Sequence, residues 1–330
     1  MRRERTPQPS PPVQPANPDE TLAADLTRGR RRSNKPAPSP SKPSPPETRR
    51  RSAPGLVTIP AWTQYPWLIA GCSTRQGGLS TAYAAGGPPE QNLGYTTEDD
   101  PATILAARRR LVATLTKSRK PAPDLITIRQ CHTGIIQRVN RADLPLTTPD
   151  HKAILRGDAL YTRDPNLLLG ILTADCVPVL VADTRTHAIA AFHAGWRGTL
   201  ARIVEHGIET LRRDFGSRPG DLIAAIGPSI GACCFAVGPE VRDEFNSQFA
   251  YGPQLFSEID AALTPQIHMD LWEANRRQLL DAGLNPSAIT TIGHCTACTR
   301  LPDGRRKYFS HRAEKGFTGR MLSLIGTTEN

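Results

Sequence analysis

The chain has 330 residues and a formal net charge of +10. Residues 1–54 hold 13 of its 31 prolines and 12 basic residues against 5 acidic ones, with no cysteine and no aromatic residue. Such a segment cannot bury enough apolar surface to offset the entropy of ordering. We therefore predict a disordered Pro/Arg-rich tail over residues 1–54 and one nearly neutral catalytic domain over residues 55–330.

Charge and hydrophobicity argue against several broad classes of protein. The basic clusters of the tail have no aromatic side chains on which bases could stack, which disfavours a nucleic-acid function. No stretch reaches the roughly 18 apolar residues of a membrane helix, and the N-terminus lacks the apolar core of a signal peptide. The seven cysteines are an odd number in a long chain and favour a reducing compartment. We expect a cytoplasmic protein without a membrane segment.

The first predicted elements are a strand over residues 67–71 and a glycine-rich loop over residues 73–78. A helix follows, because Asp100 can cap its start and Pro101 occupies a position where a first-turn proline is tolerated. Its arginines, residues 108–110, are expected mostly to face water.

The middle of the chain has three apolar runs, at residues 167–173, 177–182 and 188–192, separated by short polar turns. They predict buried central strands. The period then becomes helical over residues 199–215, and Gly216 is expected to end that helix.

The last third continues the alternation of strands and helices. It predicts a strand over residues 222–226, helices beginning at Pro239 and Asp270, and final strands flanking Cys295 and residues 308–311. This order indicates an α/β or α+β fold in which mixed sheets are flanked by helices.

Three ligand-type side chains fall at predicted strand ends. Cys176 and His193 end two apolar strands about seventeen residues apart, and His132 follows a strand over residues 125–128. Adjacent strands would bring Cys176 and His193 to one sheet edge, where functional side chains tend to lie. Each residue alone would more often be core filler, as free cysteine commonly is.

Two imidazoles and one thiolate form a ligand set that zinc accepts, and three protein ligands leave a position for water or substrate. A metal there could activate water or polarise a substrate oxygen. Copper accepts the same ligands, so both metals remain open.

The remaining thiols give a weaker pattern. Cys295 and Cys298 form a single C-x-x-C motif without the second pair that a structural zinc site needs. Cys233 and Cys234 are adjacent and would point to opposite sides of any strand. We interpret all four as ordinary thiols.

The candidates for binding substrate or phosphate are Arg75, Arg197 and Gln130. Arg75 lies in the glycine-rich loop, and Arg197 lies at a helix start, where backbone donors favour anions. Asp175, beside Cys176, is the candidate acid or base, with a supporting hydrogen-bonding role as the alternative.

Several segments closely resemble the signature segments of the YfiH-like, laccase-domain family, formerly described as multicopper polyphenol oxidases. The two most specific are Thr-Ala-Asp-Cys-Val-Pro-Val and Phe-His-Ala-Gly-Trp-Arg-Gly, and the others follow in the expected order. The matching segments are residues 173–179, 192–198, 73–78, 92–94, 226–234, 238–241, 309–312 and 318–320.

The resemblance implies a YfiH-like fold whose zinc is bound by His132, Cys176 and His193. It also implies phosphorolysis of purine nucleosides (adenosine, inosine, guanosine and methylthioadenosine) together with deamination of adenosine. Polyphenol oxidation and peptidoglycan-precursor editing have also been linked to the family. The usual Gln-Val-His-Gly reads Gln-Cys-His-Thr at residues 130–133, and the common Asn-Arg pair reads Ala-Arg at residues 107–108.

Two rival functions remain open. Copper-dependent phenol oxidation ranks lower, since a true multicopper oxidase needs many clustered histidines and this chain has eight. A non-catalytic basic adaptor would use the tail and would have no need of an intact ligand triad. A monomer and a homodimer are both compatible with the sequence.

Overall fold

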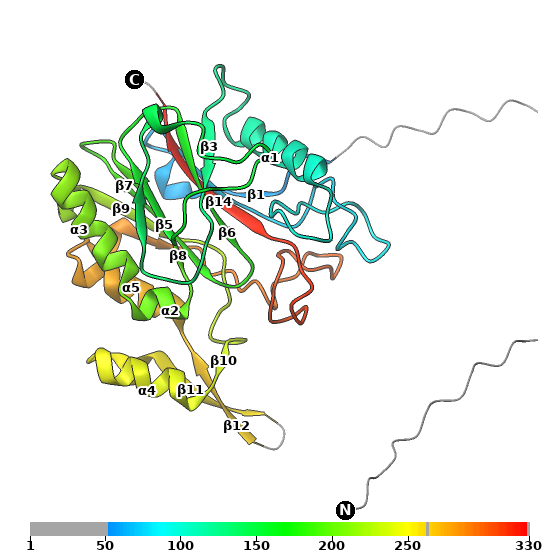
Figure 1. Cartoon of the computed structure of the whole chain (residues 1–330). Helices are drawn as coiled ribbons and strands as arrows, with labels where there is room; N and C mark the ends of the chain where they lie inside the picture. Colours follow the sequence, from blue (N-terminus) through cyan, green and yellow to red (C-terminus); the bar gives the residue numbers. More distant parts are fainter. Residues whose placement is uncertain (1–51, 262–263, 329–330) are drawn as a thin grey trace, which may run out of the picture. The chain divides into compact units, whose positions relative to one another are not determined.

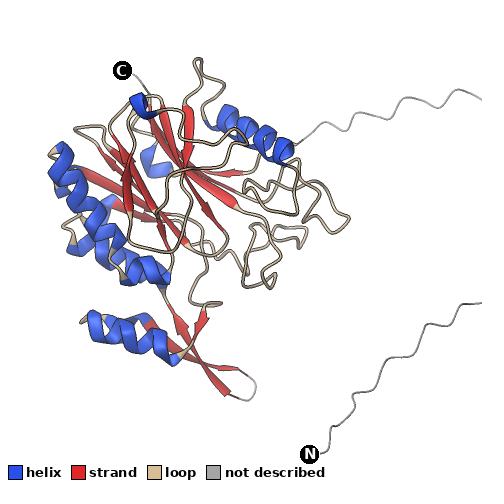
Figure 2. Ribbon diagram, viewed as in Figure 1, coloured by secondary structure: helices blue, strands red, loops and turns tan. Residues whose placement is uncertain are grey.

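Two β-sheets form the centre of the protein (Figures 1 and 2). The computed structural model describes residues 52–261 and 264–328, so nearly all of the predicted tail lies outside the described residues. The first sheet has five strands in the order β1-β2-β14-β6-β3. These strands are β1 (Leu56–Val57), β2 (Leu68–Ser73), β3 (Asp124–Thr127), β6 (Leu167–Thr173) and β14 (Met321–Thr327).

The second sheet has six strands in the order β13-β9-β7-β8-β5-β4. It mixes parallel and antiparallel pairs, with β7, β8 and β9 antiparallel at its centre. Its strands are β4 (Ile136–Arg138), β5 (Ala159–Thr162), β7 (Val177–Asp183), β8 (Ile189–Ala194), β9 (Leu222–Ile226) and β13 (Ile289–Thr291).

The apolar runs are continuous because both faces of each sheet are covered. In β6, Leu167, Leu169 and Ile171 join the core between the two sheets, whereas Leu168 packs in the cluster beneath the first helix. This alternation follows from the two-residue period of a strand. The predicted buried central strands are therefore confirmed.

Helices cover the outer faces of the two sheets (Figure 2). Helix α1 (Pro101–Leu115) packs on the first sheet, and α2 (Trp196–Leu200), α3 (Ile203–Phe215) and α5 (Leu271–Asp281) pack on the second. Asp100 caps α1 by accepting a hydrogen bond from the Thr103 backbone, as predicted. Short 3-10 helices are Pro60–Trp62, Arg141–Asp143, Pro219–Asp221, Gly252–Leu255 and Pro286–Ala288.

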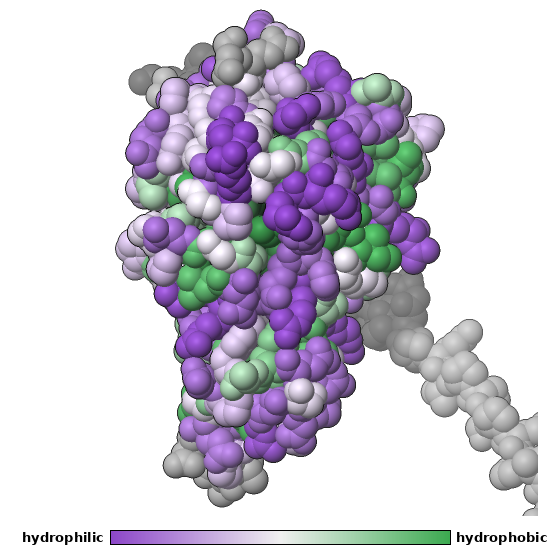
Figure 3. Space-filling view, turned by 90° about the vertical axis from the view of Figure 1, so that its left-hand side faces the viewer, coloured by the Kyte–Doolittle hydropathy of each residue, from purple (hydrophilic) through white to green (hydrophobic). Residues whose placement is uncertain are grey.

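A small third sheet lies beside helix α4 (Pro239–Gln248). It consists of β10 (Ala236–Val237), β12 (Thr264–Met269) and β11 (Phe256–Ala261). The face shown in Figure 3 is mainly hydrophilic, with hydrophobic side chains in small patches. Within the described ranges, no helix has both the length and the apolar character required to cross a membrane.

Three predicted elements need correction. The helix over residues 199–215 is divided into α2 and α3, because Arg202 has a left-handed φ of 54° that interrupts the helical backbone. Residues 308–311 form no strand, and Cys295 makes only an isolated bridge with Ser229. The sequence pattern also missed β14, which lies between β2 and β6.

The orientation of Arg108 was also predicted incorrectly. Its side chain is 7% exposed and lies on the inner face of α1. The mixed α/β architecture itself is confirmed.

Candidate metal centre and its cavity

The pairing of β7 with β8 brings two predicted ligands together. Pro178 pairs with His193, so Cys176, just before β7, lies next to the end of β8. His132 comes from the loop after β3 and has a left-handed φ of 57°. The three side chains are thus presented by backbone segments that the sheets hold in place.

The three ligand atoms of His132, Cys176 and His193 all lie within 4.8 Å of one another. The Cys176 Sγ is 3.8 Å from the His132 Nε2, and the two imidazole rings are inclined by 72°. Gly195 leaves this space open, because a Cβ there would lie 3.0 Å from the Cys176 Sγ. This donor set and its spacing fit a metal ion with one position left for water or substrate.

The buried carboxylate of Asp158 organises the centre. It accepts a hydrogen bond from the His193 Nδ1 at 2.8 Å, which leaves the Nε2 of that ring for a metal. It also accepts backbone N–H bonds from His132 and Thr133 at 3.0 and 2.6 Å. Burial opposes its ionisation, but the hydrogen bonds from His193 and Thr133 outweigh burial and lower the pKa of Asp158. A carboxylate in this position orients a metal-binding histidine.

We expect Asp158→Asn to weaken metal affinity by about 10- to 100-fold, the usual cost of losing a hydrogen-bond partner behind a ligand. The amide keeps the shape of the side chain but loses the charge that His193 and the 131–133 backbone require. Competition with a metal chelator measures the change. Unaltered affinity would show that Asp158 supports only the loop.

The half-buried Cys176 and the buried His193 form an acid–base pair when no metal is bound. Burial opposes the thiolate, but the charge of His193 and hydrogen bonds from both histidines lower the pKa of Cys176 to about 6. Burial opposes the imidazolium, but the Cys176 thiolate and Asp158 raise the pKa of His193 to about 9. Both shifts favour the thiolate–imidazolium form of the pair over its neutral form.

Metal uptake at about pH 7.5 is expected to release at least one proton, because His193 must become neutral to act as a ligand. Metal affinity should fall as the pH drops, and more steeply below about pH 6, where Cys176 also takes up a proton. Calorimetry in buffers of different ionisation enthalpy measures the proton count. Binding heats that do not depend on the buffer would contradict the protonated state of His193.

The centre opens into a cavity of about 960 Å³, a size that accommodates a small organic ligand. All three metal-ligand candidates line it, together with Gln130 and Asp175. The amide of Gln130 makes two hydrogen bonds to the Leu172 backbone, at 2.7 and 2.8 Å. The structure therefore places these five predicted site residues around one cavity.

The cavity is cationic. Arg108, Arg129, Arg312 and Arg320 line it, and over the described ranges none of them pairs with a carboxylate. Asp175 is the one carboxylate in the lining formed by the described residues. Such a surface favours an anionic ligand.

Arg108 is the most buried of these cations. Its Nε donates to the Leu93 carbonyl at 2.8 Å, and its guanidinium lies 4.5 Å from the centre of the Tyr95 ring. Burial lowers the pKa of Arg108 to about 10. The Tyr95 hydroxyl and the Thr173 Oγ1, both buried beside the same cavity, have no hydrogen-bond partner in the described structure. These groups are suited to receive the oxygens of a ligand.

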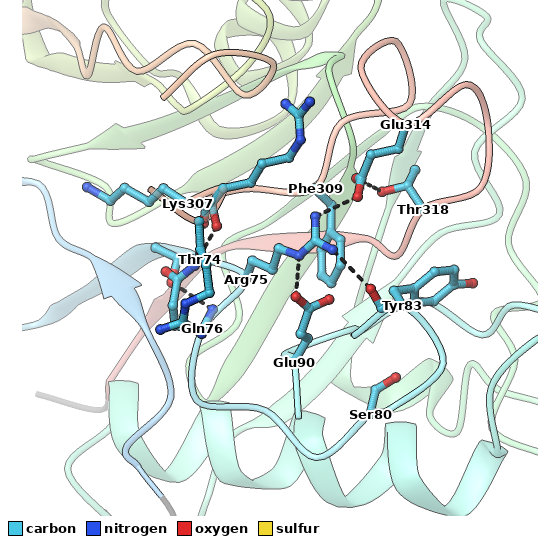
Figure 4. Close-up of polar contacts among 12 residues, drawn as sticks. Thr74, Arg75, Gln76, Ser80, Tyr83, Glu90, Lys307, Phe309, Glu314 and Thr318 are labelled. Atoms are coloured by element: carbon cyan, nitrogen blue, oxygen red, sulfur yellow. Dashed lines mark hydrogen bonds and ion pairs between the residues drawn. The ribbon is translucent and has the colours of Figure 1, made fainter. Parts of the chain in front are cut away.

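Arg75 and Arg197 do not line this cavity. The Arg75 guanidinium makes 2.6 Å ion pairs with Glu90 and Glu314, and its remaining nitrogen donates to the Tyr83 carbonyl (Figure 4). Arg197 is exposed and stacks on Trp196. The expectation that these two residues bind phosphate is not supported by their contacts. Through its ion pair with Glu314, Arg75 instead connects the glycine-rich loop over residues 73–78 to the loop that contains Glu314.

Comparison with known proteins decides the family. A model described as multi-copper polyphenol oxidoreductase laccase matches residues 69–328, which is most of the chain. The chain belongs to this family. The resemblance to the laccase-domain family seen in the sequence is therefore confirmed.

Relatives of this chain carry other names. Purine nucleoside phosphorylase YlmD of Geobacillus stearothermophilus is 34% identical over 263 residues, covering 79% of this chain and 90% of the relative. Adenosine deaminase RL5, from an unknown prokaryotic organism, is 33% identical and covers 69% and 85% of the two chains. The crystal structure of Bacillus licheniformis hypothetical protein YfiH has a TM-score of 0.71 at 30% identity, covering 84% and 98%.

Sequence reasoning missed two residues of this laccase-domain site. Asp158 follows a glycine just before a strand, and nothing local distinguishes it from a surface turn residue. Arg108 did carry a signal, because it lies four residues after Ile104 and three before Leu111, both buried on the inner face of α1.

Proposed function

We propose that this protein is a metal-dependent purine nucleoside phosphorylase with adenosine deaminase activity. The observation that carries the proposal is that the open His132, Cys176 and His193 centre shares one cavity with the buried, unpaired cation of Arg108. Relatives named for both activities support it.

Phosphate is the co-substrate that the cationic wall favours. We assign its binding to Arg108 and Arg320, since a guanidinium donates two parallel hydrogen bonds to a phosphate. Arg320 lines the cavity, and its Nη1 donates hydrogen bonds to the Thr318 and Gly319 carbonyls at 2.8 and 3.0 Å. Adenosine, inosine, guanosine and methylthioadenosine are the proposed nucleoside substrates.

Asp175 is the proposed proton carrier. In phosphorolysis, an oxygen of hydrogen phosphate bonds to the ribose anomeric carbon and the glycosidic C–N bond breaks. The departing purine nitrogen takes up the proton that hydrogen phosphate gives up, and Asp175 would accept that proton and pass it on. The Asp175 carboxylate accepts hydrogen bonds from the Thr296 Oγ1 and the Arg312 N–H, at 2.6 and 2.7 Å. About two of its four acceptor positions stay available. Unchanged turnover in Asp175→Asn would remove it from this role.

Zinc is the proposed ion, with copper as the alternative, held by His132, Cys176 and His193. Bound there, such an ion supplies Lewis-acid polarisation and activation of water, as deamination requires. Asp158 fixes the ring of His193, and the thiolate of Cys176 balances the charge. Because a thiolate ligand must remain reduced, we propose a cytoplasmic location.

The decisive experiment incubates purified, metal-analysed protein with adenosine, with and without phosphate. Chromatography then separates adenine, inosine and ribose 1-phosphate. Adenine and ribose 1-phosphate formed only with phosphate would support the phosphorylase, and inosine the deaminase. If metal-loaded protein formed neither adenine nor inosine, the proposal would be overturned, and editing of peptidoglycan precursors would be favoured.

Copper-dependent phenol oxidation is the second candidate, and it rests on the description of the matching family model. Of the eight histidines, only His132 and His193 line a ligand cluster in the described structure. Dioxygen uptake with a phenol, strictly dependent on added copper, is the result that would favour oxidation.

A further inference from the structure

Four cysteines gather at a second position, formed by two loops that are far apart in sequence. Cys233 and Cys234 lie between β9 and β10, and Cys295 and Cys298 follow β13. Their four sulfur atoms all lie within 4.8 Å of one another. The two cysteine pairs therefore lie together in the folded chain and give the four ligands that neither pair supplies alone.

The expectation that Cys233 and Cys234 point apart is wrong, because it assumed a strand. Residues 232–234 form a turn, in which the backbone N–H groups of Cys234 and Phe235 donate to the Gly231 carbonyl at 2.9 and 3.0 Å. In a turn, adjacent side chains can lie on the same side, and here both thiols face the 295–298 loop.

The spacing of the sulfurs fits a tetrahedral ion. Zinc–thiolate bonds of about 2.3 Å place neighbouring sulfurs of a regular tetrahedron about 3.8 Å apart. The Sγ atoms of Cys233 and Cys298 are 3.7 Å apart, far beyond the roughly 2.05 Å of a disulfide. The four thiols are thus arranged as ligands rather than as a bonded pair.

The protein also supplies a hydrogen bond of the kind that supports thiolate ligands. The Gly231 N–H donates to the Cys295 Sγ at 3.3 Å. Cys295 is buried, while Cys233 and Cys298 are exposed, so the cluster lies at the surface with one ligand in the interior.

We propose that Cys233, Cys234, Cys295 and Cys298 bind a second zinc ion in a closed, structural four-cysteine site. Four protein ligands leave no position for substrate, which distinguishes this site from the centre at Cys176. The proposal does not depend on the reaction that the protein catalyses.

An ion in the four-cysteine site would hold two loops whose residues contact or line the cavity. Ile230 and Phe235, on either side of the first cysteine pair, both line the cavity. Within the second pair, Thr296 donates its hydroxyl to Asp175, the neighbour of Cys176. An ion that joins the two loops would therefore fix Thr296, and through its hydrogen bond to Asp175 it would stabilise the position of the neighbouring Cys176.

Metal counting on the full-length chain tests the proposal. Native mass spectrometry and elemental analysis of protein prepared under reducing conditions, from medium containing zinc and iron, should give two zinc ions per chain. His132→Ala/His193→Ala, which removes the first centre, should retain one. Adding Cys233→Ser/Cys298→Ser should remove it, while adding Cys131→Ser, a thiol outside both clusters, should not.

Cobalt substitution in the His132→Ala/His193→Ala background gives an independent readout. Four thiolates should produce intense sulfur-to-cobalt charge-transfer bands, which Cys233→Ser/Cys298→Ser should abolish and Cys131→Ser should preserve. If a variant fails to fold, the metals of the wild-type chain decide: two zinc ions, or one zinc beside one copper, would support the proposal. A single metal ion per wild-type chain, iron in place of the four-cysteine zinc, or a Cys233–Cys298 disulfide in the reduced preparation would overturn the proposal.

Discussion

Replacing Cys176 by alanine is expected to remove the metal from the His132, Cys176 and His193 centre and to lower both phosphorolysis and deamination by at least about 100-fold. Two imidazoles alone bind the ion weakly, and a catalytic metal contributes several kcal/mol to the transition state. Metal content and the initial rates of adenine and inosine formation are the measurements.

Cys131→Ser is the matched control for this prediction. Cys131 adjoins a ligand in sequence, but its thiol belongs to neither cysteine-containing cluster, and its backbone N–H to Asp158 survives the change. We expect the control to retain its metal. If Cys176→Ala without bound metal kept the full rate of either activity, the centre would not be catalytic.

Removing the buried guanidinium in Arg108→Ala should raise the KM for phosphate by about 10- to 100-fold while leaving deamination of adenosine nearly unchanged. The estimate corresponds to the loss of one charge-assisted hydrogen-bonding partner, about 1.5–3 kcal/mol. The split between the two reactions is the informative result, because deamination uses water and no phosphate. Arg108→Lys should recover part of the affinity, since it keeps the charge without the planar fork.

Arg109→Ala is the control for Arg108, with the same residue type one position along α1 and an exposed side chain. It should leave both reactions unchanged. Equal losses of phosphorolysis and deamination in Arg108→Ala would point to a general role of this arginine in packing α1 against the cavity.

Local sequence signals predicted most of the elements that position the metal centre. The apolar runs that became β6, β7 and β8 were long enough to be recognised, and the polar turn between β7 and β8 made their pairing predictable. The meeting of Cys176 with His193 followed from that pairing. His132 was likewise recognised from its position after a predicted strand, and the family resemblance gave the same three ligands.

The parts that could not be predicted depend on contacts between distant segments. Asp158 acts through His193, 35 positions away, and no local pattern indicates such a partnership. The four-cysteine cluster joins loops about 60 residues apart, whereas each pair alone was uninformative. Arg108 was misjudged because a charged residue was expected to face water, although its helical position pointed inward.

The place of β14 affects how the protein is made. This strand, Met321–Thr327, pairs with β2 on one side and β6 on the other, near the middle of the first sheet. During synthesis the nascent chain therefore carries β2 and β6 with unpaired edges until residues 321–327 have left the ribosome. We expect chains stalled before residue 321 to expose those edges and to depend on chaperones, even though every ligand of the metal centre has already been translated.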